Sequence, residues 1–127
     1  MDSKEITSGL RFIENLHREL PGAPTQQVLI LLRIMQEPGI NQPDLADTYD
    51  LTGASVSRSL RALGQYQEND KHGNSVVKGP DLVELRPDLY RPRSLACFLT
   101  KKGKALQQKL LRTANGAGKL TLNNGEE

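Results

Sequence analysis

The 127-residue sequence predicts an α+β fold, mainly α, in which a helix-turn-helix precedes a β-hairpin and helices flank both ends. Three observations lead to this prediction. Apolar residues recur at helical spacing in several segments. Two short helical segments are joined by a tight turn at Asp50–Thr52, as in a helix-turn-helix. Two apolar stretches that follow, separated by a loop with two prolines, indicate a hairpin.

The first two predicted helices carry the longest apolar faces. Residues 3–20 form the first helix, and the Pro-Gly-Ala-Pro segment at 21–24 ends it because proline lacks a backbone N–H. Thr25 is expected to cap a second helix, from Gln26 to about Glu37, through its side-chain hydroxyl. This helix has little polar surface, which predicts that it forms the centre of the core.

The helix-turn-helix follows. Its first helix spans about Pro43–Tyr49, with proline in the first turn, where no N–H is needed. Thr52 is a good N-cap for the second helix, which is expected to reach about Tyr66. The second helix has a narrow apolar stripe at helical spacing, made of Val56, Leu60 and Leu63.

Short strands and a final helix complete the predicted fold. Val76-Val77 is expected to form a short strand and Ile40 another, while Leu82–Arg86 and Arg93–Leu99 pair as the hairpin. Thr100 caps a last helix, Lys101 to about Arg112. Residues 1–112 are therefore expected to form one domain and 113–127 a mobile C-terminal tail. This order of elements is that of a winged helix, in which the hairpin is the wing.

Charge is distributed unevenly along the chain. The formal net charge is only +2, but residues 51–112 hold 12 of the 17 Lys and Arg residues and 5 of the 15 Asp and Glu residues. The basic part of the chain therefore includes the second helix of the helix-turn-helix and the predicted wing. That distribution is typical of a surface that binds phosphate groups.

Other classes of function find little support. Cys97 is the single cysteine, so no internal disulfide can form, and we expect a packed side chain rather than a redox switch. One cysteine and two distant histidines offer no metal-ligand spacing, and catalytic motifs are absent. We expect no enzymatic activity, cofactor or metal. No signal peptide or membrane-spanning run is recognisable, so a cytoplasmic location is expected.

The second helix of the helix-turn-helix has the features of a DNA recognition helix. Gly53 and Ala54 make its first turn slim, which permits close approach to the bases. Arg58 is the first candidate for a base contact, because arginine can donate two hydrogen bonds to guanine. The full set of predicted DNA-binding residues is Thr52, Gly53, Ala54, Ser55, Ser57, Arg58, Arg61, Arg91 and Arg93.

The other polar members of this set have lesser expected roles. Ser55 and Ser57 are expected to meet phosphates or base edges, and Arg61 a phosphate. Arg91 and Arg93, in the wing, are candidates for a minor groove. For each residue the alternative is a side chain that is simply solvated on the protein surface, and for Arg58 a phosphate contact is a second alternative.

With the hairpin included, the chain resembles the MarR family of transcriptional regulators. Three stretches carry the resemblance: QPDLADTYDLTGASVSRSLRAL at 42–63, LVELRPD at 82–88 and SLACFLTKKGKAL at 94–106. They are similar to the family's helix-turn-helix, first wing strand and Leu-Thr-x-x-Gly ending. Two features depart from the family. An insertion occupies Gln65–Asp81, for which the alternatives are a longer helix, an extended sheet or a segment that projects beside the DNA. Arg91-Pro92 stands where the wing usually has Asp followed by Arg.

The resemblance implies a repressor that binds a palindromic operator as a homodimer. The expected dimerisation residues, on the N- and C-terminal helices, are Ile6, Leu10, Ile13, Leu106 and Leu110. The alternative is that both helices pack only on their own chain. Some family members respond to a small-molecule effector, but no residue here identifies one. A winged-helix protein–protein interaction module and a replication-associated DNA-binding protein remain alternative functions.

Overall fold

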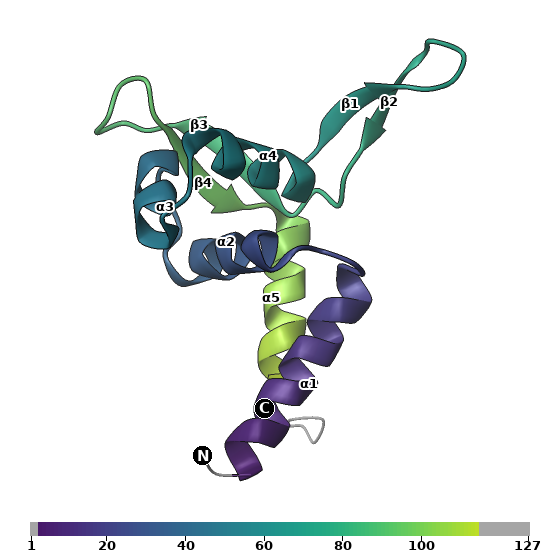
Figure 1. Cartoon of the computed structure of the whole chain (residues 1–127), viewed down its shortest axis with the longest axis vertical. Coiled ribbons are helices and arrows are strands. Elements are labelled where there is room, and N and C mark those ends of the chain that lie inside the picture. The colour runs from purple at the N-terminus through teal and green to yellow at the C-terminus, as the bar shows by residue number, and fades with distance from the viewer. Residues whose placement is uncertain (1–2, 115–127) are drawn as a thin grey trace. The chain divides into compact units, whose positions relative to one another are not determined.

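The structure, a computed structural model, describes residues 3–114 and confirms a mainly helical α+β fold (Figure 1). The elements are α1 (Ser3–Glu19), α2 (Thr25–Gln36), α3 (Gln42–Tyr49), α4 (Gly53–Leu63), β1 (Tyr66–Asn69), β2 (Ser75–Lys78), β3 (Val83–Pro87), β4 (Leu95–Leu99) and α5 (Lys101–Ala114). Of the tail predicted at 113–127, the first two residues belong to α5, and residues 115–127 lie outside the described part of the chain. No described helix is long and apolar enough to cross a membrane.

The chain divides into two compact units. Pro24–Lys104 forms the larger unit, which holds the helix-turn-helix and the four strands. The described residues 3–23 and 105–114 belong to the other, so it contains α1 and most of α5. In this second unit Lys109 Nζ lies 2.6 Å from a carboxylate oxygen of Glu19, which joins α5 to α1.

The core of the larger unit forms around α2, as its largely apolar sequence predicts. Helices α2 and α4 pack together, and both contribute fully buried side chains. The buried apolar residues of α2, α3 and α4 are Ile30, Leu31, Ile34, Leu45, Val56, Leu60 and Leu63. Burying each such side chain contributes roughly 1.5–3 kcal/mol to folding. One face of α4 is therefore held firmly in place.

Two helix starts differ from prediction. Thr25 is the first residue of α2 rather than its cap, and Pro24 occupies the N-cap position without a side-chain hydrogen bond. Asn41 caps α3, and its Oδ1 accepts a hydrogen bond from the Asp44 N–H at 2.9 Å. Asn followed two residues later by Pro is a recognisable helix-start signal. The cap at Asn41 could therefore have been found in the sequence.

Helix α4 ends at Leu63 and not at Tyr66 as predicted. Gly64 closes it, with its N–H donating to the Leu60 carbonyl at 3.0 Å. The Val83 carbonyl oxygen would lie only 3.0 Å from a Cβ at position 64, which favours glycine there. The chain then leaves the helical path and continues as β1.

The four strands form two separate antiparallel hairpins. Strand β1 pairs with β2 from Tyr66↔Lys78 to Asn69↔Ser75, and β3 pairs with β4 from Val83↔Leu99 to Pro87↔Leu95. The predicted strand at Val76-Val77 lies in β2, but its partner β1 was not predicted. The insertion thus adds a hairpin of its own and does not extend the wing sheet.

The wing also differs in detail from its prediction. Strand β4 begins at Leu95 instead of Arg93, because Arg93 has φ +83°, in the left-handed region, and belongs to the loop. In place of a strand at Ile40, an isolated bridge joins Asn41 to Ala96. The Cys97 N–H donates to the Ile40 carbonyl beside it at 2.8 Å. We call residues 83–99 the wing and residues 66–78 the inserted hairpin.

Candidate nucleic-acid interface

Helix α4 is fixed by polar as well as apolar contacts. Its buried face includes Ser59, whose hydroxyl accepts a hydrogen bond from Gln26 Nε2 of α2 at 3.1 Å. The same amide nitrogen lies 3.4 Å from the Ser55 carbonyl oxygen. Gln26 was not among the predicted site residues, since nothing in the sequence links it to α4. It helps to set the orientation in which α4 presents its outer face.

The N-terminal turn of α4 carries the predicted DNA-binding residues on an accessible surface. Asp50, at φ +53°, makes the turn between α3 and α4, and among residues other than glycine Asp and Asn tolerate this conformation best. The Thr52 hydroxyl accepts from the Ser55 N–H at 3.1 Å and so caps the helix. Gly53 and Ala54 are exposed beside it. The slim first turn predicted from the sequence is therefore open to a ligand.

Ser55, Ser57 and Arg58 differ in their surroundings. The Ser55 hydroxyl accepts from Thr52 Oγ1 at 3.0 Å and from Arg58 Nη2 at 3.3 Å. Ser55 is half-buried, whereas Ser57 and Arg58 are exposed. Ser55 therefore orients the Arg58 guanidinium, and Ser57 presents its side chain to solvent.

Arg61 connects α4 to the inserted hairpin. Its guanidinium carbon lies 4.3 Å from the centre of the Tyr66 ring, and Nη2 donates to the Gln67 carbonyl at 3.4 Å. A cation–π contact at an exposed site contributes about 0.5–1 kcal/mol. Tyr66 was missed as a site residue because it was expected to be the last residue of the helix rather than the first residue of a strand.

The wing loop is tied to the start of α3. The Asp88 carboxylate accepts from the Tyr90 N–H at 2.9 Å and from Asn41 Nδ2 at 3.2 Å. These two hydrogen bonds, with a smaller effect of Arg91, hold the pKa of Asp88 below its ordinary value. Arg91 also forms an ion pair with Asp44 of α3, at 3.5 Å.

The two wing arginines therefore differ. Arg91 points to a carboxylate of its own chain. Arg93 is exposed and forms no ion pair within residues 3–114. Arg93 is the wing arginine whose guanidinium is available to a ligand.

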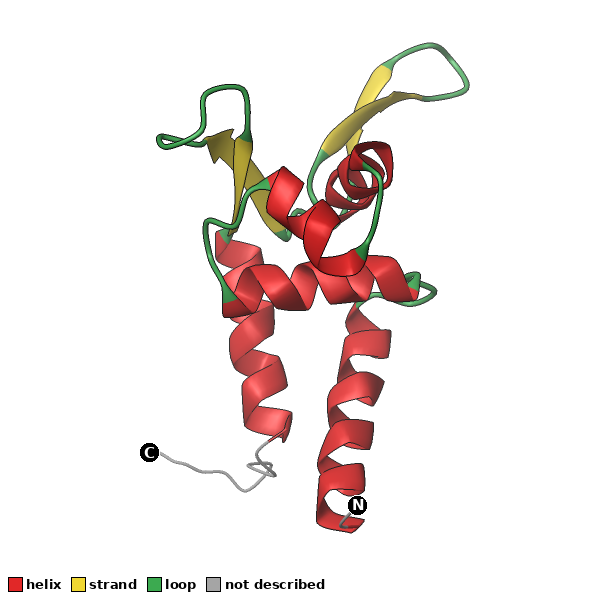
Figure 2. Cartoon of the chain, turned by 60° about the vertical axis from the view of Figure 1, so that its left-hand side comes forward, coloured by secondary structure: helices red, strands yellow, loops and turns green. Residues whose placement is uncertain are grey.

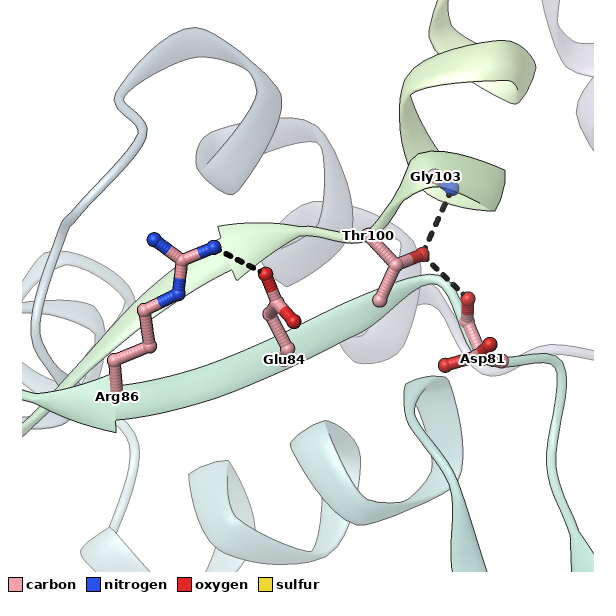
Figure 3. A network of polar contacts seen from close by, with 5 residues as sticks. All are labelled: Asp81, Glu84, Arg86, Thr100 and Gly103. Carbon is pink, nitrogen blue, oxygen red and sulfur yellow. Dashed lines mark hydrogen bonds and ion pairs between the residues drawn. The ribbon is translucent and has the colours of Figure 1, made fainter.

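The base of the wing is closed by Thr100, at the start of α5 (Figure 3). Its hydroxyl donates to the Asp81 carbonyl at 2.6 Å and accepts from the Gly103 N–H at 3.0 Å. On the wing sheet, Arg86 pairs with Glu84 and its guanidinium carbon lies 4.5 Å from the centre of the Phe98 ring. Arg86 is therefore engaged within the wing sheet.

An open groove of about 620 Å³ runs beside α4. Its lining includes Arg61 and Ser57 of α4, Tyr66 of the inserted hairpin and Leu85 of the wing. Residues of the inserted hairpin and of the wing sheet thus both line the groove. Both hairpins extend from the larger unit on the side away from α2, and they stand apart as two arms (Figures 1 and 2).

Within residues 3–114 no three His, Cys, Asp or Glu side chains gather as a metal site would require. Cys97 is fully buried on β4, and burial raises the pKa of its thiol to about 12. A thiol in that state is not a nucleophile near neutral pH.

The residues predicted to form a dimer fall into two groups in the unit that contains α1. Ile6, Leu10 and Ile13 are each more than half exposed on one face of α1. Leu106 and Leu110 on α5 are buried within the chain, at 6% and 1% exposure. Leu111 is 47% exposed. The apolar surface left open by the fold is thus on α1 and at Leu111.

The chain matches no protein-family model and no curated protein. Its fold does resemble solved structures. A structure of MarR has a TM-score of 0.53 and 22% identity, over 93% of this chain and 72% of that one. The structure of a MarR family transcription regulator has a TM-score of 0.54 and 24% identity, over 91% of this chain and 63% of that one. The structure of the YusO protein from Bacillus subtilis has a TM-score of 0.56 and 12% identity, over 88% of this chain and 68% of that one. The chain therefore has a MarR-like winged-helix fold.

Proposed function

We propose that this protein is a sequence-specific DNA-binding transcriptional regulator. The observation that carries the proposal is the way α4 is presented. One face of α4 is buried against the core, and its slim, capped first turn and Arg58 lie exposed on the other side. A helix presented in this way fits a DNA major groove, and its free N–H groups favour phosphates. The MarR-like fold, which it shares with a transcription regulator, supports the proposal.

The contacts divide into those that read sequence and those that position the protein. Arg58 reads a base, and Ser57, Thr52 and the slim turn meet the neighbouring backbone. Arg93 extends from the wing toward an adjacent minor groove. Arg61 and Arg91, both engaged within the chain, act mainly by holding the inserted hairpin and the wing loop.

The regulator acts as a homodimer on a palindromic site. A single recognition helix contacts few base pairs, and a twofold dimer places two helices on matching half-sites. The exposed α1 residues Ile6, Leu10 and Ile13 supply a continuous apolar face for this contact, and Leu111 is a further candidate. Replacing Leu10 by Glu is expected to turn the dimer into a monomer in sedimentation experiments and to weaken binding to the full site. A wild-type monomer at all concentrations would contradict this assignment.

Repression is the simplest regulatory outcome. A dimer that occupies a promoter blocks polymerase without a further domain or activity. In a purified transcription assay, a template whose promoter overlaps the bound site should lose its transcript as protein is added. An increase in transcript would identify an activator, and no change would favour a replication-associated role.

The decisive experiment is selection of bound duplexes from a random pool at two salt concentrations. We expect an enriched palindrome with half-sites about one helical turn, roughly 10 base pairs, apart. Affinity should fall as salt rises, because phosphate contacts release counterions. Arg58→Ala should lower affinity for the enriched site by about 5- to 150-fold, the equivalent of 1–3 kcal/mol for a bidentate contact.

Arg18→Ala on α1 is the matched control for Arg58→Ala. It removes the same charge from an exposed helix outside the larger unit and should leave the selected sequence unchanged. Salt-sensitive binding without an enriched sequence would show architectural binding instead. A failure to bind any duplex at low salt would refute the proposal and favour the protein–protein interaction module.

A further inference from the structure

We infer that the inserted hairpin is a second DNA-contacting arm, which brings Lys71 to the phosphate backbone beyond the C-terminal end of α4. This inference rests on the proposed DNA-binding function. The wing loop is tied to the start of α3 through Asp88 and Arg91, whereas the inserted hairpin grows from the end of α4. The two arms therefore contact DNA on either side of the recognition helix.

The base of the inserted hairpin is held close to the last turn of α4. The Asp81 N–H donates to the Gly64 carbonyl at 3.1 Å, and the Leu82 N–H donates to the Leu63 carbonyl at 2.8 Å. Gly79 adopts φ +102°, and its Cα lies so near that a Cβ would be 2.2 Å from Gly64 O. The segments that lead into and out of the hairpin therefore cross in close contact at the last turn of α4.

The direction of the hairpin is set from the recognition helix itself. Arg61 stacks on Tyr66 and donates to Gln67, so a side chain of α4 holds the first strand. Across the strands, Lys78 Nζ pairs with Glu68 at 2.9 Å. With these contacts in place, the hairpin extends to the same side of the unit as the wing (Figures 1 and 2).

The tip presents groups that suit a phosphate backbone. Asp70 Oδ1 accepts the N–H groups of His72 and Asn74 at 2.8 and 2.9 Å, so this carboxylate faces into the turn. The side chains of Lys71, His72 and Asn74 are exposed around it. Within residues 3–114, Lys71 has no carboxylate at ion-pair distance. A flexible ammonium of this kind binds phosphate as a point charge and carries no sequence preference.

Hydroxyl-radical footprinting on the enriched duplex tests this arm directly. Wild-type protein should protect the backbone in two patches, on either side of the groove that α4 enters. Lys71→Gln should lose one patch and Arg93→Ala the other, and Lys71→Arg should restore the first. The slope of log affinity against log salt should fall by about 0.9 for each lysine–phosphate contact removed.

Tyr66→Ala tests the mechanism by which the arm is positioned. This variant retains the Lys71 side chain but removes the ring on which Arg61 stacks, so that the hairpin is no longer held in its direction. It should therefore lose the same protected patch as Lys71→Gln, at unchanged helix content. If Lys71→Gln keeps both patches and the full salt slope while Arg58→Ala still weakens binding, the second arm is refuted and the proposed function stands. If wild-type protein protects no duplex, the proposed function fails, and the inference fails with it.

Discussion

Replacing Gly79 by Ala is expected to destabilise the protein by about 2–5 kcal/mol, through two separable effects. The first is conformational, because Gly79 has φ +102° and a side chain in the left-handed region costs about 1–2 kcal/mol. The second is steric, because the new Cβ would lie 2.2 Å from the Gly64 carbonyl oxygen. That oxygen belongs to the backbone and accepts the Asp81 N–H, so relief requires a backbone shift costing about 1–3 kcal/mol.

Three other glycines allow the two effects to be measured separately. Gly73 has φ +81° with open space around it, so Gly73→Ala carries the conformational cost alone. Gly103→Ala carries only the steric cost, since its Cβ would lie 2.1 Å from the Leu82 carbonyl oxygen at an ordinary helical φ. Gly53 has neither restriction, and Gly53→Ala should be neutral or stabilise α4 by less than about 1 kcal/mol.

Urea unfolding followed by circular dichroism gives the four differences in free energy of unfolding. We expect Gly79→Ala to be the most destabilised, with the single-effect variants at Gly73 and Gly103 between it and Gly53→Ala. The reasoning would be refuted if Gly79→Ala were no less stable than Gly73→Ala. The close crossing at the base of the inserted hairpin would then not exist in solution.

Three further predictions concern α4, the wing and its buried thiol. Thr52→Ala should cost about 1 kcal/mol in urea unfolding, because the Ser55 N–H loses its acceptor; a null effect would argue against the cap. Cys97 should resist alkylation at pH 8 until the chain unfolds, and the raised thiol pKa means that its contribution to stability declines as pH rises from about 9 to about 12; rapid labelling of folded protein would contradict this. Asp88 has a lowered folded-state pKa, so its contribution is present at neutral pH and is lost as pH falls through that pKa. Asp88→Asn should therefore flatten the acid side of a Tm–pH profile, and an unchanged profile would show that the carboxylate makes no net contribution.

The sequence was most informative where local chemistry sets the local structure. Thr52 and Thr100 were both predicted as helix caps, and both hydroxyls accept a backbone N–H three residues on. The apolar stripe of Val56, Leu60 and Leu63 is the buried face of α4. These features depend on spacings of three or four residues, which the sequence displays directly.

Side-chain partners across the fold were not predictable in the same way. The intramolecular partners of two predicted site residues come from other elements: Arg61 lies against Tyr66 of the inserted hairpin, and Arg91 against Asp44 of α3. An exposed arginine can reach several partners, and which one it meets depends on where another element returns. The predicted DNA contacts, those of Ser55, Arg61 and Arg91 included, remain predictions.

The order of the helices, the caps at Thr52 and Thr100, the wing and the basic character of residues 51–112 all follow from the sequence. That Gln65–Asp81 forms a separate hairpin was learned from the tertiary structure, in which α4 ends at Gly64 and the Val83 carbonyl oxygen would lie 3.0 Å from a Cβ at that position. The tertiary structure also explains why the sequence has threonine at position 100 and glycine at position 103. Thr100 binds the Asp81 carbonyl, and Gly103 leaves room for the Leu82 carbonyl 2.1 Å from where a Cβ would be. Gly64 and Gly103 are each required because a backbone carbonyl about 20 residues away in sequence packs against them, and such contacts form only when the chain folds.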